Sequence, residues 1–166
     1  MATLLAFPIL GILLIFQTAV FSDLMLVHGT ADLVLVAVTA WALQRQVETA
    51  WQWGIIGGLL VTIASALPLG VALIAYPAVV GIAILLRQRV WQVPVLAMFV
   101  STIIGTFVLH AISLFTLRLA GSALPILESL ELITLPSMLL NLLVAIPAFV
   151  IFSDMADWLY PQEIEV

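Results

Sequence analysis

The side chains that could carry chemistry in this sequence are few, and most lie inside or beside long apolar runs. Thr102, Thr106, His110 and Ser113 follow at spacings of four, four and three, so a helix would place them on one face. A histidine on such a face could relay protons or bind a ligand. It could equally be a neutral ring held by a neighbouring hydroxyl or carbonyl. We favour the second interpretation, because no acidic residue lies within the same run.

Asp32 stands directly before a short apolar run, 33–43. The run is too short to cross about 30 Å of hydrocarbon as a helix. The span could begin earlier and bury Asp32 with His28, the membrane could thin locally, or Asp32 could cap the helix at the far interface while Arg45 reaches the near one. We expect Asp32 to be an outer helix cap, because an unpaired acid inside a membrane is costly.

Two pairs of carboxylates stand three residues apart, Glu128 with Glu131 and Asp154 with Asp157. Such pairs can collect a cation, but neither has a histidine or a further acid at metal-ligand spacing, so we interpret both as solvated helix faces. Walker A, HExxH and GxSxG sequences are all missing from the chain. We therefore expect no enzyme, no cofactor and no bound metal.

Three glycines, Gly54, Gly57 and Gly58, fall within five residues of an apolar run. Gly54 and Gly58 form a GxxxG pair, which lets a neighbouring helix approach closely. Because glycine otherwise only weakens a helix, we interpret these residues as a helix-packing surface. The neighbour could belong to this chain or to a partner protein, and we favour internal packing.

Composition sets the class of protein. The chain has 166 residues, of which 65% are hydrophobic and only 8% are charged, whereas about a quarter of a soluble domain is charged. Lipid must therefore be the solvent for most of the chain. With four basic residues the chain has no nucleic-acid footprint, and without cysteine it has no disulfide or thiolate chemistry.

The apolar runs predict an all-α, polytopic membrane protein. Each run is taken as one transmembrane helix of a single compact bundle that covers residues 1–166. The predicted spans are 3–21, 32–43, 51–66, 70–86, 93–117 and 133–152. An even number of spans places both termini on the same side of the membrane.

Basic residues orient this bundle. The connectors after the second and fourth spans carry Arg45, Arg87 and Arg89, whereas the opposite side carries only Arg118. By the positive-inside rule, these two connectors and both termini are cytoplasmic. We therefore take Arg45, Arg87 and Arg89 as candidate contacts for cytoplasmic partners.

The ends of the spans carry further signals. Trp41, Trp51 and Trp53 flank the first basic connector, as expected of an aromatic belt at the membrane interface. Residues 126–133 alternate between an apolar face and an acidic one, which predicts a short amphipathic helix on the membrane surface. An acidic tail is expected from Ser153 onwards.

Residues 31–70 resemble the bacterial rod shape-determining protein MreD family, and the whole chain agrees with it in length and span layout. The segments that carry the resemblance are Asp32-Leu33, Trp41-Ala42-Leu43, Trp53-Gly54-Ile55-Ile56-Gly57-Gly58-Leu59-Leu60, Ser65 and Pro68-Leu69-Gly70. The chain departs from the family at Ala31, where proline is common, and at Thr62, where aspartate is common.

The resemblance implies a non-catalytic scaffold of the cell-elongation machinery in the bacterial inner membrane. Such a protein binds the bitopic protein MreC and, directly or indirectly, the cytoskeletal protein MreB and the peptidoglycan synthases.

Two other functions fit a six-span protein of this size. One is the small-molecule-binding subunit of an energy-coupling-factor transporter for a vitamin-type substrate, which needs convergent polar groups near the outer connectors. The other is an ion or proton conductor, which needs a buried acid with a partner, such as Asp32 facing His110.

Overall fold

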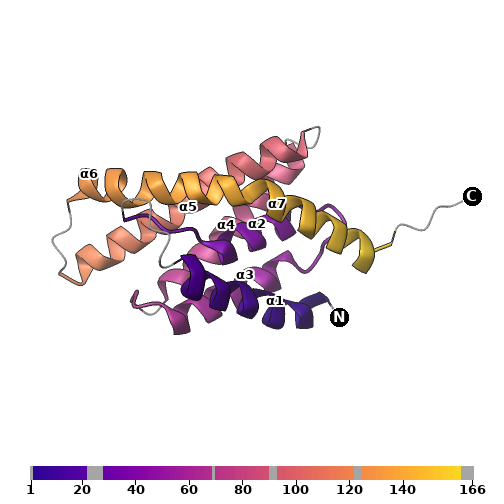
Figure 1. The fold of residues 1–166 in the computed structure, drawn as a ribbon, viewed down its shortest axis with the longest axis horizontal. Coiled ribbons are helices and arrows are strands. Elements are labelled where there is room, and N and C mark those ends of the chain that lie inside the picture. The colour runs from indigo at the N-terminus through magenta and orange to yellow at the C-terminus, as the bar shows by residue number, and fades with distance from the viewer. Residues whose placement is uncertain (1, 22–27, 69, 90–92, 122–124, 162–166) are drawn as a thin grey trace, which may run out of the picture.

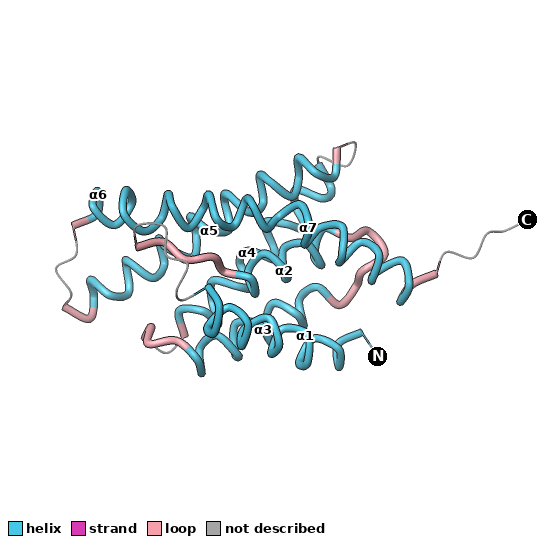
Figure 2. The backbone as a smooth tube through the Cα atoms, in the orientation of Figure 1, coloured by secondary structure: helices cyan, strands magenta, loops and turns pink. Residues whose placement is uncertain are grey.

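The computed structural model describes residues 2–21, 28–68, 70–89, 93–121 and 125–161, and these are helical apart from short connectors (Figures 1 and 2). Two π-helical turns extend the helices, at Gln17–Phe21 after α1 and at Leu130–Thr134 between α6 and α7. The α-helices are α1 (Ala2–Phe16), α2 (Leu33–Leu43), α3 (Ala50–Ala64), α4 (Val71–Arg89), α5 (Pro94–Leu119), α6 (Ile126–Ser129) and α7 (Leu135–Leu159).

The helix α2 forms the centre of the bundle. All of its residues are buried, and it contacts α1, α3, α4, α5 and α7. Its sequence, LVLVAVTAWAL, is apolar on every side, which is the pattern of a helix enclosed by others. With 11 residues it is about 16 Å long, so it does not by itself cover the thickness of a bilayer.

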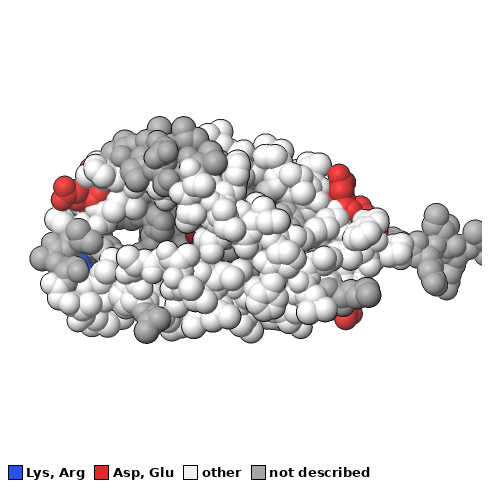
Figure 3. Space-filling view, turned by 60° about the horizontal axis from the view of Figure 1, so that its bottom comes forward, with Lys and Arg blue, Asp and Glu red and all other residues white. Residues whose placement is uncertain are grey.

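In the part of the chain that the structure describes, four helical segments are long and apolar enough to cross a membrane, whereas α2 and α3 are shorter. The chain therefore has the character of a membrane protein. On the face that Figure 3 shows, the acidic side chains lie mostly toward the two ends of the long axis, with a broad uncharged band between them. The long segments are Ala2–Ala19, Val71–Arg89, Pro94–Leu119 and Ile126–Leu159.

The three glycines of α3 face other helices of the same chain. A Cβ atom added at Gly58 would lie 2.7 Å from the carbonyl oxygen of Ala72 in α4. One added at Gly54 would lie 2.7 Å from a methyl group of Val80, also in α4. Gly57 lies against α2. The glycines thus allow α3 to approach α2 and α4 at backbone distance, which leaves no room there for a partner protein.

Two of the three tryptophans expected at the membrane interface belong instead to the core. Trp41 and Trp53 are fully buried and stacked, with ring centroids 4.6 Å apart, and Phe152 packs edge-on against both. Each indole N–H has a partner inside the chain, since Trp53 donates to the carbonyl of Ala2 and Trp41 to the hydroxyl of Thr49. Trp51 alone of the three is exposed.

The predicted surface helix is not a separate element. The helical run continues from Ile126 to Leu159, through the π-helical turn. Pro136 lacks the N–H that would bond the carbonyl of Leu132, and the backbone N–H of His28 donates to that carbonyl instead, at 3.2 Å. An external donor therefore lets the helix pass the proline without a break.

Two helices continue well beyond the residues at which the predicted spans end. The last helix continues past 152 to Leu159, because Phe152 and Ala156 face the core while Asp154 and Asp157 point outward. The acidic residues are thus one side of a helix and not the start of a tail. Similarly, α4 continues past 86 to Arg89.

Replacing Gly58 with leucine should disrupt the bundle, because its Cβ would meet backbone atoms that cannot move aside. Overpacking of a well-packed core costs about 1–3 kcal/mol, and we expect at least the upper end of that range. The free energy of unfolding of the purified chain measures this effect. Gly11→Leu is the matched control, since a Cβ at Gly11 meets nothing within 4 Å. Equal stability of the two variants would contradict the packing role of Gly58.

Candidate functional site

Two side chains from different parts of the chain cap the N-terminus of α2. The Oδ1 atom of Asp32 accepts a hydrogen bond from the backbone N–H of Leu35, at 2.9 Å. The Oε1 atom of Gln17, in the π-helical turn after α1, accepts from the N–H groups of Leu33 and Val34, at 2.8 and 3.4 Å. The first N–H groups of a helix lack partners within it, so these two side chains satisfy donors that lipid could not.

Asp32 is also the centre of a polar cluster that joins four helices. Its carboxylate accepts a hydrogen bond from the hydroxyl of Tyr76 in α4, with O–O distances of 2.7 and 2.9 Å. Its backbone N–H donates to Oδ1 of Asn141 in α7, at 2.7 Å, and the Nδ2 atom of Asn141 donates to the hydroxyl of Thr106 in α5. Asp32 is therefore both a helix cap and a junction between α2, α4 and α7.

The polar residues on one face of α5 form hydrogen bonds with different partners. Nδ1 of His110 lies 3.1 Å from the hydroxyl of Thr134, which itself donates to the carbonyl of Ser129. The second ring nitrogen of His110, Nε2, is the atom left for another partner. Ser113 donates to a carbonyl of its own helix. The hydroxyl of Thr102 has no hydrogen-bond partner among the described residues.

A cavity of about 650 Å³ lies at this end of the bundle, and Asp32 and His110 both line it. Figure 3 shows the molecular surface hollowed near the same end. Most of the cavity wall is apolar. The polar or charged residues of the wall are Gln17, Thr30, Asp32, Ser65, His110, Ser113, Arg118, Ser129 and Thr134.

The opposite end of α2 is held by an arginine. One guanidinium nitrogen of Arg87, in the last turn of α4, donates to the backbone carbonyls of Gln44 and Val47, at 2.5 and 3.3 Å. The amide of Gln44 donates to the carbonyl of Ala40. A cation near the C-terminus of a helix also interacts favourably with the helix dipole. Arg87 thus supports the fold where α2 ends, besides facing a cavity.

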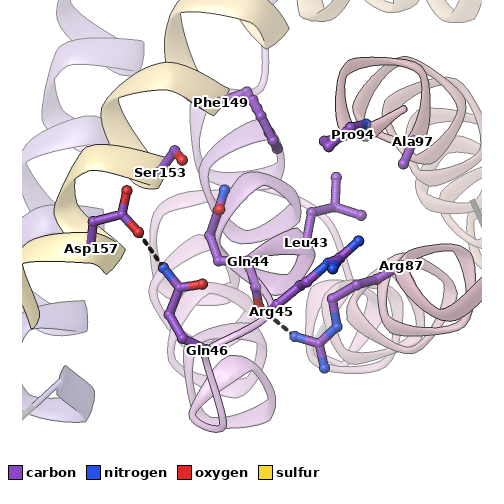
Figure 4. Close-up of a pocket in the computed structure, with 10 residues that line it drawn as sticks. All are labelled: Leu43, Gln44, Arg45, Gln46, Arg87, Pro94, Ala97, Phe149, Ser153 and Asp157. Atoms are coloured by element: carbon purple, nitrogen blue, oxygen red, sulfur yellow. Dashed lines mark hydrogen bonds between the residues drawn. The ribbon is translucent and has the colours of Figure 1, made fainter. Parts of the chain in front are cut away.

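That second cavity, of about 240 Å³, lies between the connector after α2 and the ends of α4, α5 and α7 (Figure 4). Arg45 and Arg87 lie on one side of it and Ser153 and Asp157 on the other. Asp157 accepts a hydrogen bond from the amide of Gln46, at 2.7 Å. Two of the three predicted connector arginines, Arg45 and Arg87, therefore line the same cavity.

The remaining predicted site residues lie apart from both cavities. Arg89 is exposed and is not among the residues that line the cavity beside Arg87. The α3 glycines pack internally, although Gly57 lies against Tyr76 and so supports the polar cluster from behind.

Sequence reasoning missed Tyr76 and Asn141 as members of the cluster. Each was visible as a rare residue in an apolar run, since the sequence has two tyrosines and one asparagine. A single hydrogen-bonding side chain in a membrane helix needs a partner, so this rarity was the available signal. Which partner each residue finds depends on how distant helices meet.

The described residues hold no group of three or more His, Cys, Asp or Glu side chains placed to bind a metal ion. The polar groups at the two ends of α2 bind backbone and one another. No family model, curated protein or solved structure matches the chain.

Removing the Tyr76 hydroxyl should destabilise the fold by about 1–3 kcal/mol, because it takes a donor from a partly buried carboxylate. In a double-mutant cycle, Tyr76→Phe and Asp32→Asn should be non-additive by at least about 0.5 kcal/mol. Equilibrium unfolding of the purified variants provides the measurement. Tyr160→Phe is the control, since that hydroxyl makes one long contact of 3.5 Å. Strict additivity would show that the Asp32–Tyr76 contact is not energetically coupled.

Arg87→Met should lower stability by about 1–3 kcal/mol, because the carbonyls at the end of α2 lose their charged donor. Arg89→Met removes the same charge two residues away and should change stability by less than about 0.5 kcal/mol. Thermal unfolding of both variants at two salt concentrations tests this difference. If both lost the same stability, net charge and not the contact would be responsible.

Proposed function

We propose that this protein is a non-catalytic scaffold of the bacterial cell-elongation machinery, related in function to MreD. It would lie in the inner membrane as six spans with both termini in the cytoplasm. It would bind an MreC-like bitopic protein and, directly or through it, MreB and the peptidoglycan synthases.

The residues that carry the family resemblance form the centre of the structure. The stretch 31–70 contains α2 and α3, the capping residue Asp32 and the connector with Arg45. The MreD-like pattern therefore coincides with the part of the chain around which the other helices pack. That coincidence supports a shared architecture, and with it the function that the resemblance implies.

The arrangement of chain ends supports the proposed topology. Trp53 at the start of α3 contacts Ala2, and Gln46 contacts Asp157 near the end of α7. The start of α1 and the end of α7 therefore lie at the same end of the bundle, together with Arg45 and Arg87 (Figure 1). By the positive-inside rule, this arginine-bearing end would be the cytoplasmic one.

The short helix α2 fits this topology as an internal span. Its irregular approach, residues 28–32, is tied to α7, because the N–H of Thr30 donates to Ser137 and that of Asp32 to Asn141. Non-helical backbone is tolerated at membrane depth where protein surrounds it. Six segments can therefore run between the two ends of the bundle although only four are long helices.

The observation that carries the scaffold role is the outward face of α1. This helix packs on α2 and α3 with one side, and it leaves Leu4, Phe7 and Ile15 exposed. Gly11 lies between Phe7 and Ile15 on that face, with open space where a side chain would be. A small residue between large apolar ones accepts a side chain from a single-span partner helix.

Gentle detergent purification of the full chain, followed by mass spectrometry of what accompanies it, tests the proposal. We expect an MreC-like single-span protein and cell-wall synthases. Gly11→Phe should reduce recovery of the single-span protein at least about tenfold, the factor that corresponds to 1.4 kcal/mol, because it fills the proposed contact. Leu143→Phe is the matched control, since Leu143 is a highly exposed residue of α7.

Equal recovery with both variants would remove α1 as the contact face, and absence of cell-elongation partners from all preparations would overturn the scaffold role.

A second candidate is the small-molecule-binding subunit of an energy-coupling-factor transporter. The observation that favours it is the cavity of about 650 Å³ between α1, α3, α5 and the α6–α7 segment. Its volume is typical of small-molecule sites. Recovery of an ATPase pair in the same purification would establish this candidate in place of the scaffold.

A further inference from the structure

The cavity beside Asp32 has the composition of a binding site for a small organic molecule. Its volume of about 650 Å³ and its mainly apolar wall are typical of such sites, in which a few polar groups orient the ligand. The wall is built from segments far apart in the sequence, including Val61, Phe107, Leu114 and Ile133. This cavity is independent of the α1 face proposed to bind a partner helix.

Asp32 has hydrogen-bonding capacity that the protein does not use. A carboxylate can accept about four hydrogen bonds. The N–H of Leu35 and the hydroxyl of Tyr76, which reaches both oxygens, donate to it, and the N–H of Val34 also interacts with it, so capacity for about one further donor remains. The groups that interact with the Asp32 carboxyl are uncharged. This acidic side chain thus lines the cavity with only uncharged groups in contact with it.

Two further groups on the wall are left with capacity to bind. His110 uses Nδ1 in a hydrogen bond with the hydroxyl of Thr134, at 3.1 Å, which leaves Nε2 as its second hydrogen-bonding atom. The hydroxyl of Ser65, at the end of α3, is buried and has no hydrogen-bond partner among the described residues. Arg118, the basic residue of the wall, already has an interaction of its own.

We propose that this cavity binds a small, mainly apolar molecule that carries one protonated amine, with the ammonium group held by the carboxylate of Asp32. An ammonium group brings donors and a positive charge, which match the remaining acceptor capacity and the negative charge of Asp32. The attraction is strong where apolar walls exclude water. An anion of the same shape would meet repulsion from the same carboxylate.

Three probes with the same ring system but different charge test this proposal. Tryptamine is the cation, tryptophol the neutral analogue and indole-3-propionate the anion. Equilibrium dialysis against the full chain in nanodiscs of zwitterionic lipid, with empty nanodiscs subtracted, measures the affinity of each. We expect tryptamine to bind at least tenfold more tightly than tryptophol, and indole-3-propionate to bind most weakly.

Three variants show where the probe binds. Asp32→Asn keeps a residue that caps helices as well as aspartate does, but removes the charge, so the preference for tryptamine should disappear while the fold persists. Ala111→Trp should block all three probes, because Ala111 lines the cavity. Ala64→Trp places the same ring at an exposed residue outside the cavity wall and should leave binding unchanged.

Equal affinity for the three probes, or an unchanged preference in Asp32→Asn, would overturn the proposal. Recovery of cell-elongation partners would be unaffected by either result, so this inference and the scaffold role can fail separately.

Discussion

The structure depends on satisfying the backbone at both ends of one short helix that water does not reach. The helix α2 is enclosed by five others, so its terminal N–H and C=O groups cannot turn to solvent. Asp32 and Gln17 accept from its first N–H groups, and Arg87 donates to the carbonyls where it ends. These contacts join α2 to α1 and α4, so the elements that satisfy its backbone also surround it.

Close packing follows from the same arrangement. A helix enclosed on all sides needs neighbours that can approach it without leaving gaps, because unfilled space forfeits dispersion energy. Gly57 lets α3 lie against α2, and Gly58 lets it lie against the backbone of α4. The glycines are used inside the chain, which leaves the outer faces of α1, α5 and α7 for lipid or for a partner.

The two ends of α2 differ in the chemistry that they offer. At one end a carboxylate with unused acceptor capacity lines a large and mainly apolar cavity. At the other, Arg45 and Arg87 face Asp157 across a smaller one. The first matches the small molecule proposed above, and the second combines cationic and anionic side chains. A scaffold that binds a partner and a carrier that binds a ligand would use different ends of the same bundle.

The sequence by itself determined the membrane character, the helical class, the approximate limits of most helices and the capping position of Asp32. These depend on composition, on runs of apolar residues and on local hydrogen-bonding habits, all of which act over a few neighbours. Only the tertiary structure decided that Trp41 and Trp53 are core residues, that Tyr76 and Asn141 meet Asp32, and that His28 lets the last helix pass Pro136. Each of these contacts joins residues distant in sequence, and such pairings depend on how the helices pack and not on any local pattern.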